Sequence, residues 1–197
     1  MEAFSDGVLA IIVTLLIFEI KAPHLDNLET ATVIAEVWKL GPKFISFAIS
    51  FFTVAIFWVN HHHFCHNLTH SDWKLLWYNN FLLFWLSVVP FTTAFIGDYP
   101  TQPLVVSLYA FVMFMAGLSF TLMGQYVLFK SQLVSDVVTP EVRRREWQRS
   151  WIGTGMYGLA AIIALLFVYA ALLIIALIPI FYVVPGLVWS NAEAGEA

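Results

Sequence analysis

Charged side chains are scarce in this chain of 197 residues: Asp, Glu, Lys and Arg together make up 11% of it, whereas apolar residues make up 60%. A soluble domain of this length needs many more polar side chains to cover its surface. Long apolar runs with tryptophan and tyrosine near their ends are instead typical of membrane-spanning helices. We therefore predict an all-α, multi-pass membrane protein whose main partner is the lipid bilayer.

Several functional motifs are missing as well. Cys65 is the one cysteine, so an intrachain disulfide is excluded. No basic stripe with interleaved aromatics indicates nucleic-acid binding, and no Ser/His/Asp arrangement or glycine-rich phosphate loop indicates an enzyme. We expect no nucleic-acid partner, no cofactor and no enzymatic activity. The first apolar segment has no basic region before it and no small-residue cleavage site after it, so we expect a retained span rather than a signal peptide.

Six membrane spans fit the apolar segments. The longest segment, Trp151 to Trp189, would extend about 58 Å as one helix, nearly twice the hydrocarbon thickness of about 30 Å. It must therefore fold back, and we place the turn near residues 169–172. Before it, residues 142–148 are expected to form a short helix beside the membrane, separate from the fifth span. The predicted spans of this single six-helix domain are residues 2–20, 41–60, 75–96, 103–129, 151–170 and 172–189.

Basic residues set the predicted orientation, because Lys and Arg concentrate in the cytoplasmic loops of membrane proteins. With the N-terminus inside, the cytoplasmic segments carry Lys74, Lys130, Arg143, Arg144, Arg145 and Arg149. Only Lys21, Lys39 and Lys43 then lie outside. We expect a protein of the cell membrane with both termini in the cytoplasm.

One face of the first predicted span is smooth and nearly uncharged. On a helical wheel with Ile11 at zero, the residues within about 60° of it include Thr14, Leu15 and Phe18. Asp6 lies at about 220°, near the opposite face. If the stripe packs against other helices it is ordinary core. If it faces a symmetry axis it is a pore wall, whose apolar constrictions can gate by dewetting. The wheel alone does not choose between these interpretations.

A run of histidines ends the second predicted span. It comprises His61, His62, His63 and His66, with His70 following. His and Cys are usual zinc ligands, and His62 and His66 are four residues apart, on one face of a helix. Adjacent histidines on a helix point in different directions, however, and nearby Cys65 and Asp72 do not complete a site. We therefore predict no bound metal.

A buried polar network is the competing interpretation of the same residues. Ionisable groups inside a membrane are costly, so Asp6 needs hydrogen-bond donors. A tryptophan or histidine N–H at the membrane boundary needs an acceptor. Polar side chains at matching depth on the first three spans are Ser5, Asp6, Trp58, His62 and Asn80. We predict that this network fixes the first span against the second and third.

These residues also carry a resemblance to a known family. The first motif is Phe4-Ser5-Asp6-Gly7-Val8-Leu9-Ala10-Ile11, followed by Thr14-Leu15-Leu16 and Glu19. The second motif is Phe57-Trp58-Val59-Asn60-His61-His62, followed by Asn80 and Pro90-Phe91. Over at least the first hundred residues the chain resembles the transmembrane protein 175 potassium channels, and its single six-span unit is similar to the prokaryotic members. The family motif begins with an arginine ahead of the phenylalanine, at the position before Met1.

The resemblance implies a potassium-selective cation channel whose central pore is formed by the first helix of each subunit in a homotetramer. It implies a constriction at Ile11, an aliphatic layer at Leu15 and a selectivity layer at Thr14, with K⁺ as the permeant ion. Phe18 stands where we expect a leucine and would crowd the outer constriction. Glu19, at about 80° on the wheel, would flank an outer vestibule. The TVGYG filter loop of ordinary potassium channels is absent from the sequence.

A proton-coupled secondary transporter is the alternative hypothesis. Asp6 and the histidine cluster would then form its proton relay. Such a transporter typically has broken helices in two related halves, and the sequence shows no convincing repeat between halves. The channel is therefore the preferred prediction.

Overall fold

The computed structural model of the chain describes residues 1–25, 28–131, 133 and 140–194. Over these residues the protein is helical, which confirms the all-α class. The elements are α1 (Glu2–Phe18), α2 (Thr30–Lys39), α3 (Gly41–His66), α4 (Trp73–Asp98), α5 (Pro103–Gln125), a π-helical turn η1 (Tyr126–Lys130), α6 (Pro140–Ala164) and α7 (Val168–Ala194).

Length and composition suit these helices to a membrane. Three segments of the described chain are long and apolar enough to cross one: Gly41–His66, Trp73–Asp98 and Pro103–Phe129. The segment Val168–Val183 is a shorter apolar helix. The 17 residues of α1 extend about 26 Å, close to the hydrocarbon thickness of about 30 Å. These segments support a multi-pass membrane protein.

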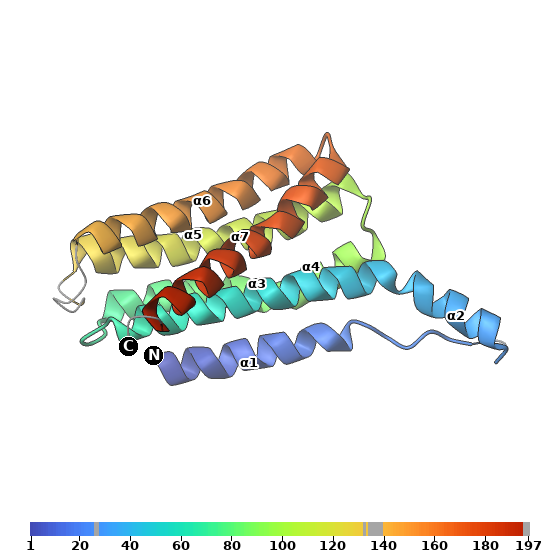
Figure 1. Ribbon diagram of the computed structural model, residues 1–197, viewed down its shortest axis with the longest axis horizontal. Helices are drawn as coiled ribbons and strands as arrows, with labels where there is room; N and C mark the ends of the chain where they lie inside the picture. The colour runs from blue at the N-terminus through green and yellow to red at the C-terminus, as the bar shows by residue number, and fades with distance from the viewer. Residues whose placement is uncertain (26–27, 132, 134–139, 195–197) are drawn as a thin grey trace.

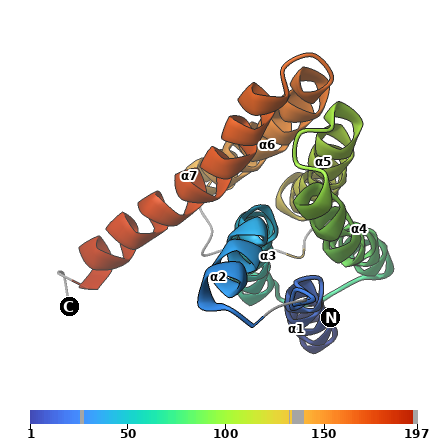
Figure 2. The same cartoon turned by 90° about the vertical axis from the view of Figure 1, so that its right-hand side faces the viewer.

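The helices form a bundle in which α1 lies at the edge (Figure 1). α1 packs against α3 and α4, α5 packs against α4 and α6, and α7 contacts α6 and α3. Figure 2 looks along the bundle and shows α1 beside α3 and α4, on the side away from α6. The first turn of α1 and the last turns of α7 lie at the same end of the bundle (Figure 1). One side of α1 therefore has no cover from the described part of its own chain.

α3 continues six residues beyond the predicted end of the second span, through the histidine run to His66. The next helix begins at an N-cap, because the Asp72 carboxylate accepts a hydrogen bond from the backbone N–H of Leu75 at 2.8 Å. The hydroxyl of Tyr126 donates to the other carboxylate oxygen of Asp72. These hydrogen bonds, that from Tyr126 first, lower the pKa of Asp72 below its ordinary value. The connection between α3 and α4 is thereby tied to η1.

The last two helices differ from the sequence-based expectation. Residues 142–148 are not a separate helix; they form the start of α6, since no proline or glycine interrupts the chain between Glu141 and Ile152. The turn lies at residues 165–167 rather than 169–172. Small buried residues flank the turn and allow α6 and α7 to approach each other closely. They are Ala160, Ala164 and Ala171.

α2 was not among the predicted elements. Its ten residues are too few to cross a membrane. The long apolar segments that predict the six spans therefore do not include it. None of its residues is buried, and it extends beyond the start of α3, away from the bundle (Figure 1).

Buried hydroxyl groups connect the helices inside the bundle. Ser50 of α3 accepts a hydrogen bond from Thr93 of α4 at 2.7 Å and shares another with Tyr109 of α5 at 2.9 Å. Thr53 of α3 lies 3.4 Å from the Tyr157 hydroxyl of α6. At membrane depth no bulk water is available, so such groups must bond to each other. The core of α3 is thereby linked to three neighbouring helices.

α4 approaches α3 closely at Gly97. A Cβ at this position would lie 2.9 Å from Ser46 Oγ and 3.3 Å from the Lys43 Cα. We expect Gly97→Ala to lower stability by about 1–3 kcal/mol, because backbone must move to admit the methyl group. The measurement is the melting temperature of the detergent-solubilised protein.

Gly124→Ala is the matched control for this prediction. A Cβ at Gly124 would have nothing within 4 Å, and alanine favours a helix over glycine by about 1 kcal/mol. Its melting temperature should stay the same or rise. Equal losses for the two alanine variants would contradict close packing at Gly97.

Candidate functional site

α1 buries one face and exposes the other. Its buried residues are Ser5, Leu9, Ile12 and Leu16. The predicted stripe lies on the exposed face: Ile11 is 59% exposed, Leu15 45% and Phe18 72%, and Thr14 is exposed beside them. The stripe is therefore not core within its own chain. It is available to lipid or to other subunits.

Thr14 is the polar group within this stripe. Its hydroxyl donates to the backbone carbonyl of Ile11 at 2.8 Å. A threonine hydroxyl has one proton to donate and two lone pairs that accept. Since the proton is used within the helix, the oxygen is left as an acceptor on the exposed face. An acceptor oxygen is the chemistry that a cation needs.

Asn79 of α4 joins the opposite face of α1 to α3. Its side-chain amide donates to Ser5 Oγ at 2.9 Å, and its Oδ1 lies 2.7 Å from His61 Nε2. We assign the proton of His61 to Nε2, because Oδ1 can only accept. His61 Nδ1 can then accept from the Cys65 thiol, 3.6 Å away. Ser5, His61 and Asn79 are buried almost completely, so this network is satisfied from within the chain.

A second polar contact joins α1 to α3 nearer the surface. The indole N–H of Trp58 donates to Asp6 Oδ1 at 2.9 Å. Asp6 is half-buried, whereas Trp58 is exposed. The aspartate therefore faces the scaffold helices and lies away from the exposed stripe. It holds α1 in its rotational position.

Two members of the predicted network are replaced by their neighbours. His61 and Asn79 take the places expected for His62 and Asn80. Successive residues on a helix are about 100° apart, and Asn80 is accordingly exposed. The spacing of the apolar residues in α4 could have identified Asn79 as the buried asparagine. Asn79 is in register with the buried Leu75, Leu82, Leu83 and Leu86.

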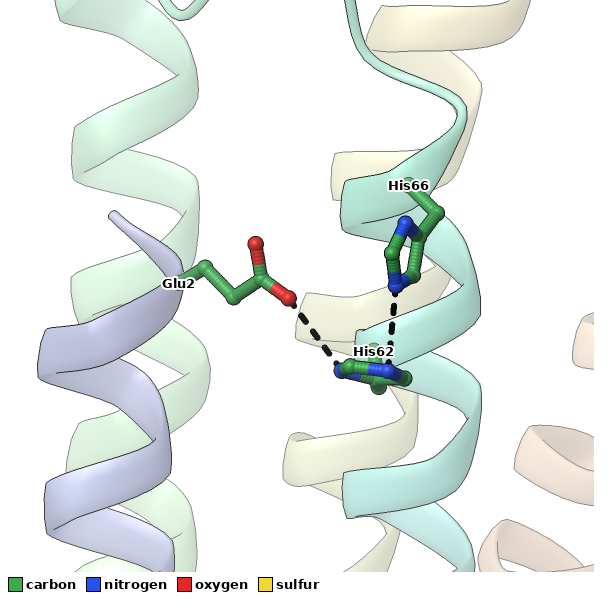
Figure 3. Close-up of side chains that lie close together, drawn as sticks. All are labelled: Glu2, His62 and His66. Carbon is green, nitrogen blue, oxygen red and sulfur yellow. Dashed lines mark hydrogen bonds and ion pairs between the residues drawn. The ribbon is translucent and has the colours of Figure 1, made fainter.

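His62 belongs to a different group of side chains. Its Nδ1 lies 3.1 Å from Glu2 Oε1, and its Nε2 lies 3.1 Å from His66 Nε2 (Figure 3). Glu2 comes from the first turn of α1 and was not among the residues singled out in the sequence. No sequence signal pairs it with a helix sixty residues away.

Glu19 lies at the other end of α1. It is half-buried and lines a small hollow together with Leu16, Lys43 and Gly97. Lys43 itself pairs with Asp98 at 2.6 Å. Glu19 therefore lies where α1 meets α3 and α4, next to the exposed stripe rather than within it.

Comparison with known proteins finds relatives among potassium channels. Residues 1–90 match the family model of the endosomal/lysosomal potassium channel TMEM175. A potassium channel of Streptomyces collinus is 30% identical over 92% of this chain and 89% of its own length. A potassium channel of a Chryseobacterium species is 34% identical over 65% of this chain and 64% of its own length. The crystal structure of a lysosomal potassium-selective channel TMEM175 homolog from Chamaesiphon minutus matches with a TM-score of 0.83 at 26% identity, covering 93% of this chain and 95% of that one.

Proposed function

This chain belongs to the TMEM175 family of potassium channels, and from that premise we propose that it forms a potassium-selective pore lined by the exposed stripe of α1. Its family and relatives are ion channels, not enzymes. The observation that carries the proposal is the division of α1 into two faces. Hydrogen bonds hold one face to α3 and α4. The other face, with Ile11, Thr14 and Leu15, is not covered by any of the residues that the structure describes.

Four copies around one axis would give this stripe its function. Rings of Ile11, Leu15 and Phe18 would form the constrictions, with the Thr14 oxygens between them. An apolar ring dewets when it is narrow, and so opposes ions. Potassium gives up its water at lower cost than sodium, so a narrow and weakly polar pore favours potassium. The homotetramer and the pore position of these four residues are parts of the proposal.

The arrangement of the helices supports the membrane topology that we propose. α1 and α3–α7 would be the six spans, with both termini in the cytoplasm of the cell. The first turn of α1 and the last turns of α7 lie at the same end (Figure 1), as six crossings require. The arginine-rich start of α6 follows the end of η1, and basic residues favour the cytoplasmic side.

Reconstitution into liposomes tests the proposed function. Vesicles loaded with K⁺ should release it down its gradient faster than vesicles without protein. Vesicles loaded with Na⁺ should release Na⁺ more slowly under the same conditions. A proton ionophore supplies the return current and should be required for sustained release. Vesicles that release no more K⁺ than protein-free controls would refute the channel. Release without ionophore in fixed ratio to proton uptake would instead favour the proton-coupled transporter that uses Asp6 and the histidines.

Removal of the Thr14 hydroxyl tests the selectivity layer. Thr14→Val keeps the shape of the side chain and removes the acceptor oxygen. We expect the preference for K⁺ over Na⁺ to fall by about two- to tenfold, because one hydrogen-bond-like contact is worth about 0.5–1.5 kcal/mol. The measurement is the ratio of K⁺ to Na⁺ flux in the same liposomes.

Thr14→Ser is the control, because it keeps the hydroxyl. It should retain most of the preference for K⁺. If both variants keep the flux ratio of the unsubstituted protein, Thr14 does not contact the permeant ion.

A further inference from the structure

Glu2, His62 and His66 form a cluster that the buried Asn79 network does not use. One carboxylate oxygen and one nitrogen from each imidazole lie within 4.8 Å of one another. Figure 3 shows Glu2 reaching from α1 toward His62 and His66 on α3. The sequence-based expectation of no metal depended on the lack of an acidic ligand near the histidines. Glu2 supplies that ligand from another helix.

The donor set has the chemistry of a zinc site. Two histidines four residues apart on a helix project from one face, as in helical zinc motifs. His62 Nε2 and His66 Nε2 are 3.1 Å apart. Ligands on a tetrahedral Zn²⁺ with bonds of about 2.0–2.1 Å are roughly 3.4 Å apart, so these two nitrogens are within a few tenths of an ångström of the spacing that the ion needs. Two histidines and a glutamate are a known three-ligand set for zinc, with the fourth position open to water.

His62 is already held in place for such a role. Its ring stacks on Trp58 with the planes 28° apart, and Trp58 is bonded to Asp6. His62 Nδ1 is buried and makes no hydrogen bond, although Glu2 Oε1 lies 3.1 Å away. The short distance and the missing hydrogen bond are both explained if the Glu2 carboxylate is close to Nδ1 but lies in a poor direction for a hydrogen bond. His62 offers one ring nitrogen to an ion, and each of its nitrogens has another potential ligand atom 3.1 Å away, Glu2 Oε1 beside Nδ1 and His66 Nε2 beside Nε2.

We propose that Glu2, His62 and His66 bind one Zn²⁺ ion per chain, which joins the first turn of α1 to the last turns of α3. This inference goes beyond the proposed channel function and does not depend on it. Without the ion, the three side chains form a partly exposed ion pair and a histidine contact. Such exposed pairs contribute little to stability. With the ion, α1 gains a cross-link to α3.

Zinc binding to the purified full chain tests this proposal. The protein is freed of any histidine tag, treated with a chelator and titrated with Zn²⁺ against a chromophoric competitor. We expect one ion per chain with a dissociation constant in the micromolar range or below. His66→Gln and Glu2→Gln should each weaken binding by about tenfold or more, since loss of even an outer-shell partner of a ligand costs about 10–100-fold in affinity. Zn²⁺ should also raise the melting temperature of the unsubstituted protein by several degrees but not that of His66→Gln.

His70→Gln is the matched control, because His70 bonds to Thr69 in the loop after α3 and lies outside the cluster. It should bind zinc as the unsubstituted protein does. Mg²⁺ should not compete, since it prefers oxygen ligands. Unchanged affinity in His66→Gln and Glu2→Gln would overturn the proposal. An equal loss in His70→Gln would also overturn it, because it would show nonspecific binding by histidines.

Discussion

Replacing Ile11 with asparagine is expected to increase potassium flux through liposomes by about tenfold and to reduce the preference for K⁺ over Na⁺. Ile11 is 59% exposed on the uncovered face of α1, where four copies would form an apolar ring. Asparagine at this position would keep water in the constriction and lower the barrier to ions. A barrier lowered by about 1.4 kcal/mol corresponds to the tenfold increase. The measurement is K⁺ and Na⁺ release from matched liposomes at equal protein content.

Ile17→Asn is the control for this prediction. Ile17 is on the same helix and is also exposed, but on the wheel it points about 120° away from Ile11. Its substitution should change flux far less than Ile11→Asn. If the two variants have equal flux, or if Ile11→Asn leaves both flux and selectivity unchanged, Ile11 does not form the constriction.

The second large effect is expected at Asn79. Asn79→Leu should destabilise the protein by about 2–5 kcal/mol, a large part of the stability of a typical domain. Leucine is similar in size, but it removes the hydrogen bonds that Asn79 makes with Ser5 and His61. Ser5 keeps its bond to the Met1 carbonyl at 3.3 Å, whereas the His61 Nε2–H loses its acceptor. Each buried polar group left without a partner costs about 1–3 kcal/mol. The melting temperature in detergent and the recovery of a single oligomeric species in size-exclusion chromatography measure the loss.

Asn80→Leu separates this effect from a general intolerance of the α4 segment. Asn80 is the next residue along the same helix and is exposed. We expect its melting temperature to stay within about a degree or two of the unsubstituted value, because exposed substitutions rarely exceed about 0.5 kcal/mol. A larger loss at Asn80 than at Asn79 would restore the network predicted from the sequence and contradict the one described here.

The contrast between Asn79 and Asn80 also shows what the sequence could predict. Positions within one helix follow from its period, so the grouping of Ile11, Thr14 and Leu15 on one face of α1 and the turned-away Asp6 could be derived from the wheel. Whether that face is exposed could not. The pairing of two helices depends on their relative rotation, which no local period determines. An error of one residue in that rotation moves a side chain by about 100°. This is why the sequence pattern predicts His62 and Asn80 at positions that His61 and Asn79 occupy.

Contacts between distant segments were missed for a related reason. Glu2 contacts His62 from another helix, and the local sequence around either residue does not predict this contact. The turn between α6 and α7 lies in a run of apolar residues without glycine or polar residues, so its position depends on how the buried alanines on either side pack. Lipid-facing and core-facing residues are equally apolar in such a run. Hydrophobicity therefore located the segments but not their connection.

The two ends of α1 are held by different kinds of interaction. Near the N-terminus, hydrogen bonds from Asn79 and Trp58 fix both the rotation and the position of the helix. Further along, Leu9, Ile12 and Leu16 hold it by apolar packing, which has no preferred direction. α1 ends at Phe18, and the next helix of the described residues begins at Thr30. The first turns of α1 would thus act as a pivot. A small tilt about that pivot would change the diameter of the proposed pore more at Phe18 than at Phe4. The outer rings are the part of such a pore that can widen at least cost.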